Sequence, residues 1–425
     1  MSEGVFTVLT LGSFTLLAYT YGGYAALLWL LGKVTRARPG RSGEPDRWPS
    51  VSVIVSAYNE EQVLGDRLRN LRELDYPPER LEVLVGSDGS TDRTTAIVEA
   101  WSDGTTRLVA FAERRGKASV LNDLVARARG DVVVLTDANT FFHPDAVRAL
   151  ATALWRHPTA CAVVGCLELR APAATGNLDG AYWRYETWLK TLESHFGTVL
   201  GANGAIYAFH RARYRPLPAG AIVDDFLVPM LMRQHAGGEV FFVPAARAWE
   251  TSPAHVRHEL RRRARIGAGD FQALRWTWRL LLPWKGMMAF SYFSHKVLRW
   301  LGPWLMLTGF VANLFLLDRP FFRWLCLGQL AFYGLGALAP AVRIAASAAR
   351  YFIALNAGLW LGAVRLVLRL QRPFWSTTPR SEAPIHANPS REPGAFNGRS
   401  GQSSNRPPGV APAGHAHRGW PEDTP

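Results

Sequence analysis

Cysteine is scarce in this chain: the 425 residues include only Cys161, Cys166 and Cys326. Their spacing forms no metal-binding pattern, so we expect no cysteine-ligated metal centre. Cys161 and Cys166 lie in or beside an apolar run, and reduced thiols are the default for a cytoplasmic domain.

Two glycine-rich nucleotide-binding motifs are also missing from the sequence. No G-x-G-x-x-G follows the first predicted strand, and no G-x-x-x-x-G-K-[ST] occurs anywhere. The first motif binds dinucleotides and the second forms a P-loop. Their absence argues against both kinds of nucleotide site.

Charge is absent from a long apolar run near the N-terminus, Val5–Leu31. A bilayer span needs about 20 apolar residues, so residues 1–32 are long enough to form a transmembrane helix. Only Glu3 precedes the run, and basic residues follow it in the linker 33–49, namely Lys33, Arg36, Arg38 and Arg41. The positive-inside rule then places the following domain in the cytoplasm and the N-terminus outside. A cleaved signal peptide fits less well, because the charge lies on the wrong side and the run is too long.

The chain as a whole is basic and rich in tryptophan. It has 48 Lys and Arg against 34 Asp and Glu, a net charge of +14, and 16 Trp. Such a composition suits either a nucleic acid or a membrane surface. The long apolar runs favour the membrane, and the positive charge lies near the membrane ends rather than in an aromatic-interleaved stripe. We therefore expect no nucleic-acid partner.

A second apolar block fills residues 297–370. Leu298–Leu317 and Phe322–Val342 are predicted spans, separated by a turn at Asp318–Pro320. Tyr351–Leu370 is a third candidate, which Arg365 interrupts. With four spans both termini lie outside, whereas the C-terminus is inside if the last segment is only interfacial. These runs predict a multi-pass protein of the cell inner membrane or plasma membrane.

Two further segments flank the predicted cytoplasmic domain, which covers residues 50–255. Residues 256–296 are rich in Arg and Trp, which predicts amphipathic helices in the membrane interface. Residues 376–425 are rich in Pro, Gly, Ser and Asn and have few apolar side chains. Such a segment cannot bury enough surface to offset its ordering entropy, so we expect a disordered tail.

Strands and helices alternate through the first part of the cytoplasmic domain. This order within about 90 residues is typical of a doubly wound, mostly parallel α/β nucleotide-binding half. β-Branched apolar runs, separated by helical patterns, predict strands at Ser50–Ala57, Leu81–Ser87, Arg107–Phe111 and Asp131–Thr136.

Polar residues follow the first predicted strand, at the end of the sheet where ligands bind in this fold class. Asn59 is a plausible N-cap for a helix that runs to about Leu74, with Glu60 and Glu61 in its first turn. Alternatively, Tyr58 and Glu60 form part of a cup that holds a nucleoside.

The second and fourth strands end in acidic residues. After the second, Thr91 or Asp92 can cap the next helix, so Asp88 has no local task and is free to bind a ligand. After the fourth, Asp137 and Asn139 offer the oxygen ligands that Mg²⁺ or Mn²⁺ prefers. The alternative for Asp137 is an ordinary turn or N-cap residue.

A cluster of cations, Arg114–Lys117, precedes the helix predicted at Ala118–Arg127. Positive charge at a helix N-terminus opposes the helix dipole. An anionic ligand such as a pyrophosphate would relieve that conflict, and a solvated loop is the alternative.

Taken in order, these motifs resemble the signature of the family 2 inverting glycosyltransferases. That family includes the membrane-embedded chitin, hyaluronan, cellulose and poly-N-acetylglucosamine synthases. The resemblance covers the chain except for the tail and the number of spans. The matching segments are Ala57–Glu60, Ser87–Asp92, Arg115–Lys117 with Asn122, Thr136–Asn139, Gly201–Tyr207, Val223–Phe226, Arg262–Ile266 with Gly269, and Trp375 with Arg380.

The resemblance implies a GT-A fold with flanking transmembrane and interfacial helices. It also implies a nucleotide-diphosphate sugar donor, with UDP-sugars favoured, a divalent metal and a lipid or glycan acceptor. By position, the implied roles are nucleoside binding by Tyr58, Glu60 and Asp88; a place near the nucleotide for Lys117; metal binding by Asp137 and Asn139; acceptor contact by Gly201, Asn203 and Gly204; and general base for Asp225.

The residue types suit that chemistry. Cleavage of a sugar–phosphate bond leaves a diphosphate, whose growing charge a metal and cations stabilise. Arg262 and Arg265 are candidate diphosphate clamps, because arginine is a forked and permanently charged donor. One base without a nucleophile means a single displacement that inverts the anomeric centre. Asp224 next to Asp225 disfavours double ionisation and makes a better base, unless the pair is only two exposed helix-start acids.

Two positions depart from the family pattern. Asn139 stands where the family has an aspartate, so a metal would be held with one charge less. Ile266 stands where a tryptophan stacks on the acceptor sugar and accompanies processive synthesis. We therefore expect transfer of one or a few sugars. The alternatives are a processive β-glycan synthase that also secretes its product, and a catalytically silent subunit of a polysaccharide assembly complex.

Overall fold

A computed structural model describes residues 3–38, 40–170, 178–202, 204–251, 256–337 and 345–371, all within the compact unit Met1–Ser381. Three predictions fall outside the described residues: the tail 376–425, the closing residues Trp375 and Arg380, and the acceptor-loop residue Asn203.

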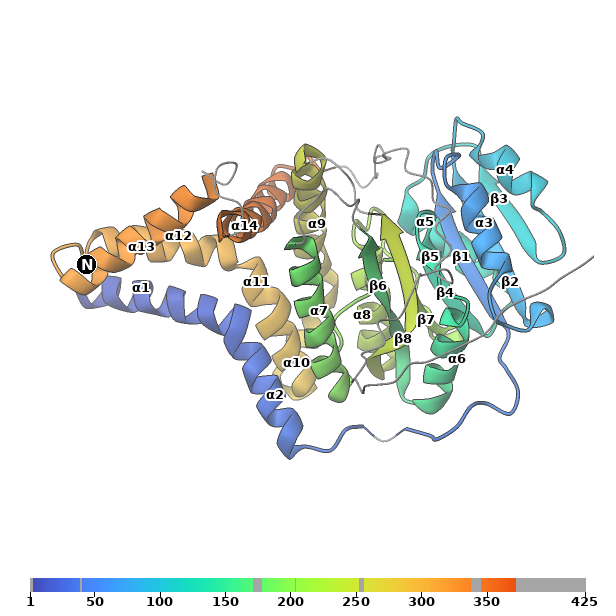
Figure 1. The fold of residues 1–425 in the computed structure, drawn as a ribbon, viewed down its shortest axis with the longest axis horizontal. Helices are drawn as coiled ribbons and strands as arrows, with labels where there is room; N and C mark the ends of the chain where they lie inside the picture. Colours follow the sequence, from blue (N-terminus) through green and yellow to red (C-terminus); the bar gives the residue numbers. More distant parts are fainter. Residues whose placement is uncertain are drawn as a thin grey trace, which may run out of the picture. The chain divides into compact units, whose positions relative to one another are not determined.

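One mixed sheet of the described residues carries the candidate site (Figure 1). Its strand order is β3-β2-β1-β4-β7-β6-β8-β5. β1 pairs in parallel with β2 and with β4, and β2 pairs in parallel with β3, which confirms the predicted doubly wound half. β7 pairs antiparallel with β4 and β6, and β8 lies parallel to β6. The strands are β1 (Val51–Ala57), β2 (Leu81–Asp88), β3 (Thr106–Phe111), β4 (Val132–Asp137), β5 (Phe141–Phe142), β6 (Ala160–Arg170), β7 (Tyr207–His210) and β8 (Glu239–Thr251).

Helices cover both faces of the sheet. Successive residues of a strand point to opposite faces, so Ile54 lies in one buried cluster while Val53 and Val55 lie in the other. The central strands are therefore apolar on both sides, as is typical of parallel sheets. The helices of this part are α3 (Leu64–Arg72), α4 (Thr94–Ala100), α5 (Lys117–Arg127), α6 (Ala146–Arg156), α7 (Leu178–His195), α8 (Asp224–Ala236) and α9 (Val256–Thr277).

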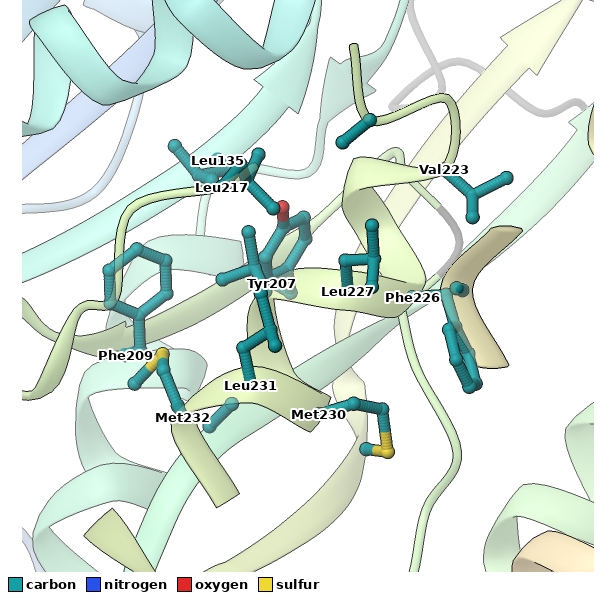
Figure 2. Packing of buried hydrophobic residues seen from close by; sticks show 14 of the residues in the cluster. Leu135, Tyr207, Phe209, Leu217, Val223, Phe226, Leu227, Met230, Leu231 and Met232 are labelled. Atoms are coloured by element: carbon teal, nitrogen blue, oxygen red, sulfur yellow. The ribbon is translucent and has the colours of Figure 1, made fainter. Parts of the chain in front are cut away.

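The cluster that contains Ile54 joins α5 and α8 to the sheet. Figure 2 shows Tyr207 and Phe209 of β7 packed near Leu227, Leu231 and Met232 of α8. All of these side chains are at most 5% exposed. The packing fixes the N-terminus of α8, which carries Asp224, relative to the end of β4, which carries Asp137.

The N-terminal apolar run forms one long helix, made of α1 (Glu3–Ala18), a π-helical segment (Tyr19–Gly23) and α2 (Tyr24–Val34). Within the described part of the chain, this helix alone is long and apolar enough to cross a membrane, judged by length and composition. It is tied to the sheet domain, because the buried Tyr24 hydroxyl donates to Glu193 Oε1 of α7 at 3.1 Å.

The C-terminal apolar block is also helical, and α12 packs along α1 while α14 packs along α9. The predicted span Leu298–Leu317 is interrupted after Trp300 and ends at Leu314. At 1.5 Å per residue α12 measures about 20 Å, less than the roughly 30 Å of a bilayer core. The C-terminal spans therefore stay a prediction. The helices are α10 (Met287–Ser291), a π-helical segment (Tyr292–Val297), α11 (Leu298–Trp300), α12 (Gly302–Leu314), α13 (Pro320–Ala337) and α14 (Ala345–Val367).

Candidate functional site

The loops that follow β1 and β2 are joined by polar contacts at the carboxyl ends of these strands. The Thr91 amide donates to Asn59 Oδ1 at 2.8 Å, and the Asn59 amide donates to Ser90 Oγ at 3.2 Å. The prediction that Asn59 caps the next helix is wrong, because α3 begins only at Leu64. Asn59 instead adopts the left-handed conformation (φ 53°) that asparagine tolerates, and it bridges the two loops.

Tyr58 and Glu60 lie in this joined pair of loops. The Glu60 amide donates to Thr94 Oγ1 at 2.8 Å, which anchors the loop to the start of α4. The Tyr58 ring stacks against the guanidinium of Arg114, with 3.7 Å between Arg114 Cζ and the ring centroid. The structure thus brings Tyr58 from the first loop beside Arg114 of the third loop, and the nucleoside-binding role of Tyr58 stays a prediction.

Asp88 at the end of β2 is fully buried and holds the third loop. Its Oδ1 accepts the Arg115 amide at 2.6 Å, and its Oδ2 accepts the Gly116 amide at 3.0 Å. Gly116 allows this turn because its φ is 88°. The expectation that Asp88 has no local task is therefore wrong. Its carboxylate sets the position of the loop that leads to Lys117.

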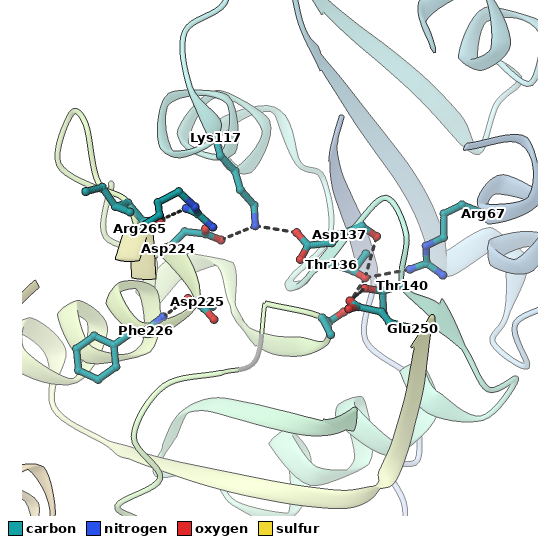
Figure 3. Close-up of polar contacts among 12 residues, drawn as sticks. Arg67, Lys117, Thr136, Asp137, Thr140, Asp224, Asp225, Phe226, Glu250 and Arg265 are labelled. Carbon is teal, nitrogen blue, oxygen red and sulfur yellow. Dashed lines mark hydrogen bonds and ion pairs between the residues drawn. The ribbon is translucent and has the colours of Figure 1, made fainter. Parts of the chain in front are cut away.

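Lys117 links the end of β4 to the start of α8 (Figure 3). Its Nζ lies 2.7 Å from Asp137 Oδ1 at the end of β4 and 3.1 Å from Asp224 Oδ2 at the start of α8. Burial lowers the pKa of Lys117, but the two carboxylates outweigh burial and raise the pKa above its usual value. The lysine is therefore charged at neutral pH and compensates two acids that come from different elements.

Asp224 and Asp225 are the first two residues of α8, where the helix dipole favours acids. Asp224 is only 8% exposed, so the pair is not two exposed helix-start acids. Burial and the neighbouring Asp224 raise the pKa of Asp225 to about 6. Asp225 is thus a stronger base than an ordinary aspartate and is still mostly ionised at pH 7.

The loop with Gly201 and Gly204 lies against these acids. The Ala202 amide donates to the Asp225 carbonyl oxygen at 2.9 Å. A Cβ atom on Gly204 would lie 3.2 Å from Asp137 Oδ2 and 3.6 Å from Asp225 Oδ2, and one on Gly201 would lie 2.9 Å from the Phe226 ring. Glycine at 204 therefore leaves room between the two carboxylates.

Arg265 of α9 approaches the same region. Its Nη1 donates to the Ile222 carbonyl oxygen at 3.1 Å, two residues before Asp224. Burial lowers the pKa of Arg265, and the carboxylates of Asp224 and Asp225 partly offset that effect. Arg262 lies one turn earlier on α9 and is exposed. Of the two predicted diphosphate clamps, Arg265 is therefore the one held beside the acids.

The predicted metal ligands fit a site that a nucleotide completes. Asp137 ends β4, and Asn139 follows in a partly exposed turn. Among the described residues no group of three or more His, Cys, Asp or Glu is placed to hold a metal ion. Mg²⁺ and Mn²⁺ often take one or two protein oxygens and complete their shell with phosphate and water. The open space that Gly204 leaves beside Asp137 Oδ2 is consistent with such a site.

Sequence reasoning missed the polar residues beneath Asp137. Arg67 of α3 is fully buried, and Thr140 donates to Glu250 of β8 at 2.5 Å. A signal for Arg67 was present, because it lies among Leu64, Leu68 and Leu71 on the apolar face of its helix. A basic residue on a buried face is unusual and needs a reason.

Two overlapping family models match the chain. The model described as "Glycosyl transferase family 2" matches residues 52–197, and the one described as "Glycosyl transferase family group 2" matches residues 132–342. Together they cover the sheet except for Val51 and extend through α13. The matched ranges contain every predicted site residue.

Curated relatives agree with these matches. The chain is 30% identical over 241 residues to the probable glycosyltransferase YdaM of Bacillus subtilis, covering 52% of this chain and 55% of that protein. It is 27% identical over 249 residues to an N-acetylglucosaminyltransferase of Mesorhizobium japonicum, covering 54% of this chain and 58% of that protein. The chain thus matches between half and two thirds of the length of these relatives.

A solved structure shares the fold. The mannosyltransferase PcManGT of Pyrobaculum calidifontis, in complex with GDP-Man and Mn²⁺, superposes with a TM-score of 0.63 at 24% identity. The match covers 85% of this chain and all of that chain. The expected α/β GT-A fold is therefore confirmed.

Proposed function

Because the chain belongs to glycosyl transferase family 2, we propose that it moves a sugar from a nucleotide-diphosphate sugar to a lipid-linked or glycan acceptor. One observation carries the proposal: Lys117 Nζ lies between Asp137 Oδ1 and Asp224 Oδ2. Asp137, the candidate metal ligand on the diphosphate side, and Asp224, the neighbour of the candidate base, therefore both contact one cation. A donor sugar seated there would have its leaving group on one side and its acceptor on the other.

On the donor side, the joined loops after β1 and β2 bind the nucleoside through Tyr58 and Glu60, while the predicted nucleoside ligand Asp88 acts by holding the Arg115–Gly116 turn beside them. Asp137 and Asn139 hold Mg²⁺ or Mn²⁺ together with the diphosphate. When bound, the metal stabilises the charge that develops on the leaving diphosphate. Lys117 and Arg265 add cations on the same side, and Arg262 reaches the diphosphate from the exposed face of α9.

On the acceptor side, Asp225 accepts the proton of the attacking hydroxyl. Its raised pKa, about 6, suits a general base that works near neutral pH. The loop that includes Gly201, Asn203 and Gly204 positions the acceptor sugar beside this carboxylate. A single displacement with one base inverts the anomeric centre, so an α-linked donor gives a β-linked product.

In this proposal the reaction takes place at the cytoplasmic face of the cell inner membrane or plasma membrane. The helix Glu3–Val34 spans the membrane. The predicted C-terminal spans, carried by α13 and α14, accompany it, whereas α12 by itself is too short to cross the bilayer core. Large apolar side chains are exposed on all of these helices, as lipid contact requires, including Val8, Leu307, Phe321, Trp324 and Trp360. A lipid-linked or membrane-proximal acceptor suits that location.

The product is short in this proposal. Ile266 is partly buried and packs against the core instead of presenting an aromatic face to a sugar. Without a stacking platform, a growing chain has one contact fewer to retain it between cycles. UDP-sugars are the favoured donors.

Binding tests the donor half of the proposal. Calorimetry on detergent-purified protein compares UDP and GDP with and without Mn²⁺. We expect one diphosphate to bind in a Mn²⁺-dependent manner and Asp137→Ala to lose the dependence. If Asp137→Ala keeps its metal-dependent nucleotide binding, the metal site lies elsewhere in the protein.

A further inference from the structure

Arg67 lies beside the predicted metal loop and is fully buried (Figure 3). Its Nη2 donates to Thr136 Oγ1 at 3.1 Å and its Nη1 donates to Asn70 Oδ1 at 2.6 Å. Its guanidinium carbon lies 4.2 Å from the centroid of the Phe142 ring. Within the described part of the chain it forms no salt bridge, and its Nε has no hydrogen-bond partner. A buried cation without a directly paired acid is costly, so another gain must offset it.

The contacts of Arg67 hold the start of the loop that carries Asp137 and Asn139. Thr136, which accepts from Arg67, immediately precedes Asp137. The end of the loop is held through Asn70, whose Oδ1 accepts the Phe142 amide and whose Nδ2 donates to the Phe142 carbonyl, each at 2.8 Å. Because Arg67 also donates to Asn70, one helix turn of α3 fixes the residues on both sides of the segment 137–141.

The same contact reaches the acceptor side. The Thr136 hydroxyl donates to the Ala205 carbonyl oxygen at 2.7 Å. Ala205 follows Gly204, which leaves room between Asp137 and Asp225. A chain of hydrogen bonds therefore runs from Arg67 through Thr136 to the loop beside the candidate base.

The charge of Arg67 faces the site as well. The acids that act most strongly on its guanidinium are Asp137 and Glu250, and burial lowers its pKa to about 9. Arg67 therefore keeps its charge at neutral pH. A fixed positive charge behind the end of β4 favours an anionic ligand in front of it.

We propose that Arg67 is a positioning residue that holds the metal loop 137–141 and, through Thr136, the Gly204 loop in register for donor and acceptor. The proposal rests on the proposed function of this site. Arg67 does not itself touch the substrate, because it is fully buried. Partners that orient metal ligands typically change metal affinity or activity about 10- to 100-fold when they are removed.

The test compares Arg67→Met and Arg67→Lys with a matched control, Arg69→Met. Arg69 lies two residues further on α3 but is exposed, and among the residues that the structure describes its one ion pair is with Asp66. Hydrogen–deuterium exchange of residues 136–142 is measured in the protein without ligands. Mn²⁺ affinity is measured separately by electron paramagnetic resonance in the presence of UDP.

We expect Arg67→Met to raise exchange across residues 136–142 and to weaken Mn²⁺ binding about 10- to 100-fold. Arg67→Lys should retain part of the exchange protection and part of the Mn²⁺ affinity, since it keeps the positive charge but not the forked guanidinium donors. Arg69→Met should match the wild type in both measurements. If Arg67→Met does not fold, Thr136→Val removes the acceptor hydroxyl at nearly constant volume and should raise exchange in the same segment. Wild-type exchange and Mn²⁺ affinity in the folded variants would overturn the proposal.

The readouts separate this proposal from the proposed function. Exchange in the ligand-free protein reports on the role of Arg67 whether or not a nucleotide binds. Failure of the wild type to bind Mn²⁺ with either UDP or GDP would count against the proposed function instead.

Discussion

Lys117 Nζ lies 2.7 Å from Asp137 Oδ1, although the two residues come from different elements of the sheet domain. Lys117 is the first residue of α5, where a cation opposes the helix dipole. The contact with Asp137 offsets that unfavourable position. It also places a charged side chain beside the predicted diphosphate site, so the ligand can take the place of the carboxylates as its partner.

Replacement of the candidate base should abolish turnover. We predict that Asp225→Asn lowers kcat about 10²- to 10⁴-fold, the usual contribution of a general base, while donor binding stays close to wild type. Steady-state kinetics and nucleotide calorimetry check the two parts. Asp75→Asn, which removes an exposed carboxylate paired with Arg148, is the control. Full turnover by Asp225→Asn with donor bound would show that the base is another group.

The pH profile should report the same carboxyl. Transfer requires ionised Asp225, so kcat should fall about tenfold per unit below its pKa of about 6 and level off above it. Asp224→Asn removes the neighbouring charge that raises this pKa, so the acidic limb should move to lower pH. A limb that stays in place, or moves to higher pH, would contradict the assignment.

Loss of the bridging cation should destabilise the protein without ligands. In Lys117→Met, Asp137 and Asp224 lose their shared partner, so we expect the free energy of unfolding to fall by about 1–3 kcal/mol. Removal of a cation from the N-terminus of α5 relieves its repulsion by the helix dipole and offsets a small part of this loss. Lys117→Arg retains the charge and is the control. Thermal unfolding with and without Mn²⁺ measures the effect. An unchanged Tm for Lys117→Met would mean that the two acids need no compensation.

Space beside Asp137 can be tested with two glycines that both have a positive φ. Gly204 and Gly237 have φ values of 76° and 69°, but a Cβ would meet Asp137 only at Gly204 and nothing within 4 Å at Gly237. Alanine at either position costs about 1–3 kcal/mol of backbone strain. Only Gly204→Ala should also weaken Mn²⁺-dependent nucleotide binding. Equal effects of the two variants would mean that strain alone explains the loss.

The four parallel strands could be predicted because each is a β-branched apolar run that ends in polar residues. Val132–Asp137, for example, is buried up to the carboxylate that ends it. The order of the remaining strands could not be predicted, because it depends on pairings between strands that lie far apart in the sequence, such as β6 with β8.

Roles that rest on long-range contacts were harder to predict. Asp88 looked free of local partners because its two amide donors come 27 and 28 residues later. Asn59 looked like an N-cap because its partners lie in the next loop. The sequence identifies polar residues at the ends of strands, but only the fold shows which of them form hydrogen bonds with one another.

The central claim is sugar transfer by the site around Lys117, and turnover tests it most directly. Detergent-purified protein is incubated with Mn²⁺ or Mg²⁺, a panel of UDP- and GDP-sugars, and membrane lipid extract, and products are read by mass spectrometry. We predict a metal-dependent product that carries one or a few sugars on a lipid or glycan and disappears with Asp225→Asn. Absence of any product from every donor, while nucleotide still binds, would contradict the account and favour a silent assembly subunit.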